Sequence, residues 1–254
     1  MEAGIRIGQA DIVKKHCKIL IIEPHPDDAV LSMGGTLSEL RERGADLISV
    51  VVFSEIQQKN REIRKKESNT VWKEDLSGGV YYLDLPDENF HKTHDDKLVI
   101  NNASKTVFLR CIQGLEQLIN KLNPNIIYFP IGIGGHFHHV MVNMCFDMIY
   151  SKHTDKQFYF YEDYPYSDFS RVTYAKYVFR LWKKFNIQEE YRLIEKYIEM
   201  KKCLISRYKS QAEKENNNVE MLIEEYGKAI SCEGIMKGYN LNNEKPYERV
   251  WKVI

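Results

Sequence analysis

The chain has 254 residues, of which 43% are hydrophobic and 28% charged, and its formal net charge at pH 7 is zero. This composition is typical of a globular protein with a sizeable core, and the balanced charge favours neither nucleic acid nor an anionic membrane surface as a partner. No apolar stretch approaches the roughly 18 residues of a membrane span, and residues 1–15 lack the apolar core of a signal peptide.

The five cysteines are scattered and form no C-x-x-C pair. Such a distribution is typical of a protein in a reducing compartment, where most cysteines are simply buried. We therefore expect a cytoplasmic protein with no membrane span, and a homo-oligomer is compatible with the sequence.

Apolar runs and helical periods alternate through residue 161. Short apolar runs predict strands at Cys17–Glu23, Asp46–Phe53, Val80–Leu83, Asn125–Phe129 and Phe158–Tyr161. Helices are predicted from Gly34 to about Arg43 with Gly44 as its cap, at Ile63–Trp72, at Ser104–Leu122, and from His139 onward. This alternation predicts an α/β fold with a mostly parallel sheet, helices on both faces and right-handed crossovers.

The pattern changes after about residue 170. Long charged periods predict a helix at Glu189–Glu215 and another at Val219–Ala229. With no linker composition and no internal repeat, we expect one domain over residues 1–254, in which residues 170–254 form a helical C-terminal elaboration.

Two polar clusters each follow a predicted strand. Residues 25–28 read His-Pro-Asp-Asp, and residues 135–139 read Gly-His-Phe-His-His. Ligands bind beyond the carboxyl ends of parallel strands, so we expect the clusters to meet there. A hydrolytic zinc needs about three protein ligands and an open position for water. A lone H-x-x-H or H-P-D-D motif is more often structural, but the two together favour a metal site.

The two clusters also contain groups for catalysis. Asp27 can face a metal-activated water, take its proton and pass it to a leaving group. His136 can donate to the oxyanion of a tetrahedral intermediate.

The sequence resembles the LmbE/PIG-L-like family of metal-dependent de-N-acetylases. The matching motifs run nearly the whole length of the chain in the family's order: residues 24–35, residues 130–139, Arg64 with Glu67, Leu85–Asp87, Tyr161–Tyr166, Tyr208–Gln211 and Tyr247–Trp251. The resemblance implies a Rossmann-like fold and hydrolysis of an N-acyl group, usually acetyl, from an amino-sugar moiety.

The same resemblance implies a role for each residue of the two clusters. It implies zinc bound by His25, Asp28 and His139, with Asp27 as general base and His136 as the charge-stabilising histidine. Two histidines and a carboxylate also suit Fe²⁺, so the sequence alone leaves zinc and iron open.

The chain departs from the family at two positions. Many members carry Glu where this chain has Ala29, although some share the Ala. Members commonly have Asp between the histidines of the second motif, where this chain has His138. Because an aspartate would favour the imidazolium form of His136, we expect His138 to leave the pKa of His136 lower than Asp would.

Five further residues are predicted to contact the substrate: Arg64, Asp87, Glu162, Asp163 and Tyr166. Arg64 and Asp87 are proposed by resemblance, and the others because aromatic faces suit sugar rings and carboxylates suit hydroxyls or an ammonium product. The alternative for Arg64 is a charge on a helix surface, and that for Asp87 is a turn residue. The alternative for the other three residues is a strand end with core tyrosines.

The sequence therefore predicts a metal-dependent N-deacetylase acting on a free amino sugar, a glycoconjugate or a specialised metabolite. One alternative is a non-catalytic family member that binds only sugar or metal. Another is an amidase that cleaves a larger thiol conjugate or acyl chain. A nucleotide-binding protein is disfavoured because the chain lacks the G-x-G-x-x-G spacing.

Overall fold

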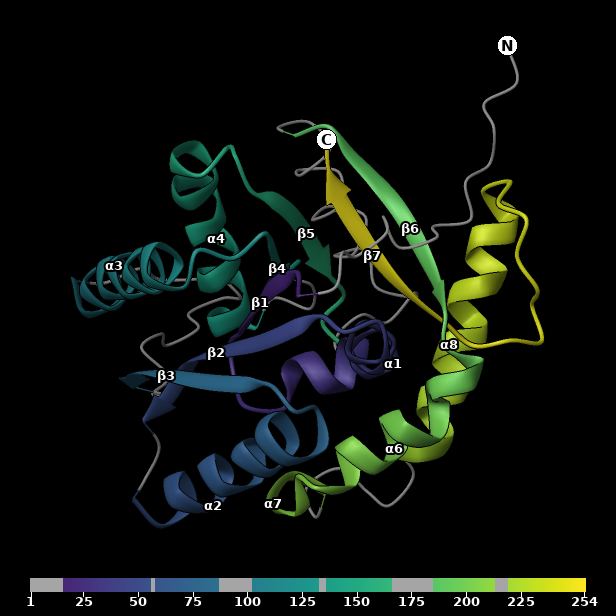
Figure 1. Cartoon of the computed structure of the whole chain (residues 1–254), viewed down its shortest axis with the longest axis horizontal. Coiled ribbons are helices and arrows are strands. Elements are labelled where there is room, and N and C mark those ends of the chain that lie inside the picture. The colour runs from purple at the N-terminus through teal and green to yellow at the C-terminus, as the bar shows by residue number, and fades with distance from the viewer. Residues whose placement is uncertain (1–15, 56–57, 87–101, 133–135, 166–184, 213–218) are drawn as a thin grey trace, which may run out of the picture.

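The computed structural model describes residues 16–55, 58–86, 102–132, 136–165, 185–212 and 219–254. One seven-stranded sheet, in the order β3-β2-β1-β4-β5-β7-β6, forms the centre of the molecule (Figure 1). The strands are β1 (Lys18–Glu23), β2 (Asp46–Glu55), β3 (Gly79–Pro86), β4 (Ile126–Pro130), β5 (Gln157–Tyr161), β6 (Ile187–Leu193) and β7 (Tyr247–Val253). The first five are parallel, and β7 runs antiparallel to both β5 and β6.

Helices cover both faces of this sheet (Figure 1). They are α1 (Asp28–Glu42), α2 (Gln58–Asn69) with the π-helical turn η1 (Thr70–Asp75), α3 (Asn102–Leu122), α4 (Phe137–Lys152), the 3₁₀ turn η3 (Glu195–Tyr197), α6 (Ile198–Ser206), α7 (Lys209–Ala212) and α8 (Val219–Met236). Alternate residues of β1 enter two cores, since Leu20 and Ile22 pack with α3 and α4 while Ile19 and Ile21 pack with α1, η1 and α6. The predicted α/β class with helices on both faces is confirmed.

The five strands predicted up to residue 161 are all present, with ends that differ by a few residues. Gly44 also caps α1 as predicted, because its φ of 81° lies in the left-handed region and its amide donates to the carbonyl of Arg41.

Helix α1 begins at Asp28, six residues before the predicted start at Gly34. The backbone at Met33 is non-helical (φ −138°, ψ 27°), so the helix consists of two pieces, and only the second was predicted. Gly35, near the start of the second piece, lies where a Cβ would come within 2.6 Å of Ile194 Cγ2, so a side chain here would force Ile194 to shift.

A carboxylate from the last strand caps this second piece. The amides of Gly35 and Thr36 donate to Glu248 at 3.0 and 2.7 Å. The ammonium of Lys201 in α6 lies 2.7 Å from the same carboxylate, and this pair is almost fully buried. Strand β7 therefore fixes the helix that begins with Asp28.

The predicted helix at Glu189–Glu215 is wrong. Residues 187–193 form the edge strand β6, paired with β7, and two short helices, α6 and α7, follow. Several charged residues in this range are buried, among them Glu189, Arg192 and Lys201. Glu189 accepts from the hydroxyl of Tyr191 and from Lys237, which follows α8. Among the described residues, no helix is long and apolar enough to cross a membrane.

Candidate functional site

The order of the strands places the two polar clusters side by side. The first strand, β1, lies inside the sheet. Strands β2 and β3 follow on one side of it, and β4 is then added on its other side. The carboxyl ends of β1 and β4 therefore flank the point where the strand order reverses, which is the usual ligand site of open α/β sheets. Residues 25–28 follow β1, and residues 136–139 follow β4.

His25, Asp28 and His139 converge at this point. Nδ1 of His25 lies 3.2 Å, and Nε2 of His139 3.3 Å, from Oδ2 of Asp28. A tetrahedral zinc with bonds of 2.0–2.1 Å places neighbouring ligand atoms about 3.3 Å apart. All three residues are buried, and the three ligand atoms lie within 4.8 Å of one another. The donor set and its spacing therefore fit a divalent metal.

The charges of this cluster favour a cation. Burial opposes ionisation of Asp28, but His139 and His25 hold its pKa well below the ordinary value. Burial would lower the pKa of His139, yet the carboxylates of Asp28 and Asp163 raise it to about 10. In this arrangement a proton on His139 supplies the positive charge that a bound metal would supply.

Asp163 contacts a residue of this cluster. Its Oδ1 lies 2.6 Å from Nδ1 of His139, and both side chains are completely buried. A carboxylate behind a ligating histidine fixes the ring and its tautomer, leaving Nε2 to face the metal. Asp163 was predicted to bind substrate, whereas its observed contact orients His139.

Asp27 lies beside the candidate ligands and is held by Arg64. Nη2 of Arg64 is 3.0 Å from Oδ1 of Asp27. Burial raises the pKa of the Asp27 carboxyl, Arg64 lowers it and Asp28 raises it, with a net shift upwards. A carboxylate with a raised pKa is a better proton acceptor at neutral pH than an ordinary aspartate.

His136 is the N-cap residue of α4, with an extended backbone (φ −62°, ψ 123°). Its ring centroid lies 5.2 Å from that of His25 and 5.1 Å from that of His139. Burial, followed by the neighbouring histidines His25, His139 and His138, lowers the pKa of His136 to about 3. Burial rather than His138 is the main cause. The expected difference between His138 and an aspartate at the same position stays a prediction.

His138 faces the second ring nitrogen of His25. Its Nδ1 is 2.9 Å from Nε2 of His25. Its ring centroid is 5.4 Å from that of His136. The sequence had suggested an action on His136, and the hydrogen bond to His25 was not expected.

Glu162 points into a buried ion-pair network. Its carboxylate accepts from Nε and Nη2 of Arg249 in β7 and from the hydroxyl of Tyr226 in α8, and Glu162 is 2% exposed. A substrate contact would have to displace these partners. The predictions for Asp87 and Tyr166 fall outside the described residues.

Sequence reasoning assigned no role to Glu23, at the end of β1. This residue is fully buried, accepts from the amide of Ala29 at 3.0 Å and accepts from the hydroxyl of Ser49. Burial raises its pKa well above the ordinary value. It tethers the segment 24–29 that carries the first cluster, and an acidic residue closing an apolar strand was the signal for it.

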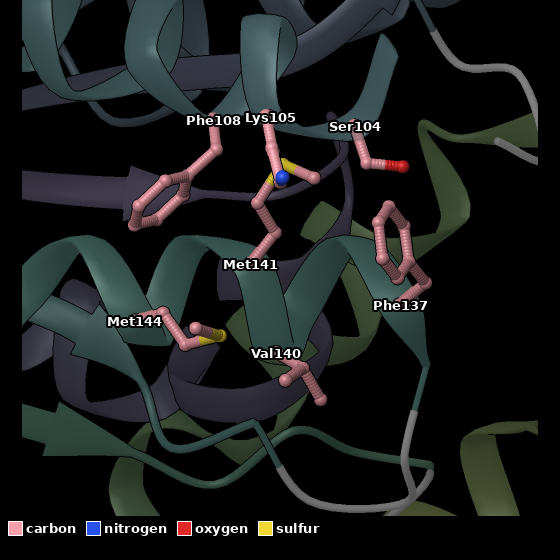
Figure 2. A pocket seen from close by; sticks show the side chains of 7 residues that line it. All are labelled: Ser104, Lys105, Phe108, Phe137, Val140, Met141 and Met144. Carbon is pink, nitrogen blue, oxygen red and sulfur yellow. The ribbon is translucent and has the colours of Figure 1, made fainter. Parts of the chain in front are cut away.

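An apolar cavity of about 60 Å³ lies between α3 and α4 (Figure 2). The residues from α4 lie on one helix face, and none of the histidines and aspartates of the two polar clusters lines the cavity. The lining residues are Ser104, Lys105, Phe108, Phe137, Val140, Met141 and Met144. It is therefore separate from the candidate metal site.

A family model described as PIG-L, GlcNAc-PI de-N-acetylase, matches residues 20–150, which include both polar clusters. The match covers just over half of the chain. This chain belongs to the PIG-L family. The resemblance stated from the sequence is thereby confirmed. A comparison with curated protein sequences finds no match.

Solved structures of the same fold include two deacetylases. The zinc-inhibited form of teicoplanin deacetylase is 18% identical, with a TM-score of 0.71 over 93% of this chain and 98% of that one. N,N′-diacetylchitobiose deacetylase from Pyrococcus horikoshii is 19% identical, with a TM-score of 0.61 over 97% and 87%. A 4-carboxy-2-hydroxymuconate hydratase from Pseudomonas putida is 14% identical, with a TM-score of 0.57 over 93% and 96%. The fold is thus shared by more than one chemistry, and function depends on the site.

Proposed function

We propose that this protein is a metal-dependent hydrolase that removes an N-acetyl group from an amino sugar or a conjugate that contains one. The observation that carries the proposal is the convergence of His25, Asp28 and His139 at metal-ligand spacing beside Asp27. Family membership and the two deacetylases of the same fold support an amide substrate on a sugar.

His25, Asp28 and His139 would hold the metal, with zinc as the first candidate and Fe²⁺ as the alternative. When bound, a divalent metal would lower the pKa of the attacking water and polarise the carbonyl of the amide.

Asp27 acts as the general base in this proposal. Its carboxylate takes the proton of the attacking water and later delivers a proton to the departing amine. Arg64 holds Asp27 in place through one oxygen, so the other oxygen can face the reacting atoms. This contact gives Arg64 a role in orienting the base, in addition to any direct contact with substrate.

His136 stabilises the oxyanion that forms from the amide carbonyl. Because its pKa is lowered to about 3, the ring is neutral near pH 7 and donates an N–H rather than a full positive charge. The extended backbone at the N-cap leaves the side chain outside the helix, close to both metal-ligand histidines.

Acetate release tests the proposal most directly. Purified protein is loaded with Zn²⁺ or Fe²⁺, its metal content is measured, and the same sample is incubated with N-acetylated amino sugars, their conjugates and long-chain N-acyl analogues. We expect acetate release that needs the metal and is lost in Asp27→Asn. Metal binding without hydrolysis of any amide would contradict it and favour a non-catalytic binding protein. Turnover of long-chain analogues alone would indicate the amidase alternative.

A further inference from the structure

His138 lies between a predicted metal ligand and an aromatic side chain. Its Nδ1 is 2.9 Å from Nε2 of His25, and its ring is stacked on Phe53 of β2, with centroids 4.0 Å apart and planes 20° apart. Only 2% of His138 is exposed. The ring is therefore fixed in one plane with Nδ1 directed at His25.

The two nitrogens of His25 face different partners. Nδ1 faces Asp28 Oδ2 at 3.2 Å, so this nitrogen is the one available to a metal held with Asp28. In a neutral imidazole that ligates through Nδ1, the proton sits on Nε2. That proton then points at Nδ1 of His138, which must be the acceptor.

The other ligating histidine has the same arrangement with its nitrogens exchanged. Nε2 of His139 faces Asp28, and its Nδ1 faces Asp163 at 2.6 Å. Ligating histidines usually donate their second N–H to such a partner, which fixes the tautomer and the ring. Nδ1 of His139 therefore faces a carboxylate, whereas Nε2 of His25 faces an imidazole.

A second set of possible ligands must be weighed against this reading. His25, His136 and His138 also bring one ligand atom each within 4.8 Å of one another. A metal bound there would use Nε2 of His25 and break its hydrogen bond to His138. The set also lacks a carboxylate to offset the charge of the ion. Both sets contain His25, so filling both at once would require His25 to lose both ring protons. Only one set is therefore filled, and the set with Asp28 is favoured because it contains a carboxylate.

We propose that His138 is a positioning residue of the metal site: it accepts the Nε2–H of His25 and thereby fixes Nδ1 as the ligating atom. This inference rests on the metal site of the proposed function. Because a neutral ring replaces an anion behind His25, the metal is held less tightly than it would be with a carboxylate at that position.

Two substitutions separate the hydrogen bond from the packing. His138→Phe keeps a ring to stack on Phe53 but has no acceptor. His138→Asn loses the stacking ring but keeps an acceptor oxygen at the position of Nδ1. His153→Phe, at the other end of the same helix, is the matched control.

The dissociation constants of Zn²⁺ and Co²⁺ are measured by competition with a chromophoric chelator, together with the number of ions bound per chain. We expect His138→Phe to weaken binding about 10- to 100-fold, the usual effect of losing such a partner. We expect His138→Asn to stay within a few-fold of wild type and His153→Phe to change nothing. In the Zn²⁺-loaded wild type, long-range ¹H–¹⁵N spectra should show His25 protonated at Nε2.

A packing role would give the reverse order, with Asn weaker than Phe, and would overturn the inference. Equal metal affinity of wild type and His138→Phe would also overturn the inference. A second bound ion that is lost in His138→Phe would overturn it too, because His138 would then be a ligand. Wild-type protein that binds no metal would overturn the metal site of the proposed function as well, so the two failures are distinguishable.

Discussion

The proton on His139 provides a quantitative test of the metal site. In the metal-free protein, Asp28 and Asp163 overcome the effect of burial and raise the pKa of His139 to about 10. A metal can bind only the neutral ring, so binding must displace this proton at any pH below that value. The apparent affinity should therefore improve as pH rises and level off near the folded pKa. From a pKa of about 10, proton competition weakens binding about 100-fold at pH 8 and about tenfold at pH 9.

Asp163→Asn should change both the slope and the plateau of this dependence. Removing the carboxylate lowers the pKa of His139, so less of the affinity is lost to the proton at pH 7. It also removes the charged partner that orients the ring, which costs about 10- to 100-fold in affinity once the proton is gone. The ratio of mutant to wild-type dissociation constants should therefore be smallest near pH 7 and grow towards pH 9.

The assay is a chelator competition for Zn²⁺ at intervals from pH 7 to 9, corrected for protonation of the chelator. A wild-type affinity that does not change over this range would refute the reasoning, because it would mean that no proton competes with the metal. An Asp163→Asn curve parallel to the wild type would show that Asp163 does not set the protonation of His139.

Three further substitutions follow from the contacts around the site. Asp27→Asn should retain the metal but lower kcat by about 100-fold or more, the usual scale for removal of a general base. Arg64→Gln should raise the pKa of Asp27 further, since Arg64 opposes the effect of burial, and so move the acidic limb of the kcat/KM profile to higher pH. Glu248→Gln should leave the ammonium of Lys201 buried without its counter-charge and lower the free energy of unfolding by about 3–5 kcal/mol, measured by chemical denaturation.

Neighbouring charges supply the controls. Arg61→Gln, on the same helix as Arg64, removes a partly exposed pair with Asp84 and should leave the acidic limb in place. Glu195→Gln breaks an exposed pair with Lys245 and should cost less than about 1 kcal/mol. If Asp27→Asn turned over at the wild-type rate, the base would be another residue. If Glu248→Gln were no less stable than Glu195→Gln, the buried pair would contribute nothing to the fold.

The sequence was sufficient for the five parallel strands and for the place of the two polar clusters at their carboxyl ends. Apolar runs such as Ile19–Ile22 mark strands buried on both faces, and parallel strands bring the residues after β1 and β4 to one edge. These are local patterns combined with a rule of topology, so they can be read without coordinates.

Contacts between distant side chains could not be read in this way. The pairing of Asp163 with His139 and of His138 with His25 depends on which atoms of each ring face each other, which spacing does not determine. The charged residues of β6 predicted a helix, although this segment pairs with β7 in the sheet. The charge of Glu189 is balanced by Lys237, a residue far along the chain, and the local sequence does not show this pairing.

The cap that Glu248 provides for α1 also has a consequence for the order in which the protein is completed. All three predicted metal ligands, the last of them His139, are synthesised before Glu248. About 100 further residues must be added in between, which takes about 5–20 s at ordinary rates of synthesis. During that interval the nascent chain carries every ligand, but the amides of Gly35 and Thr36 still lack the carboxylate that joins them to β7. A metal captured early therefore meets a scaffold in which the second piece of α1 still lacks its cap from β7.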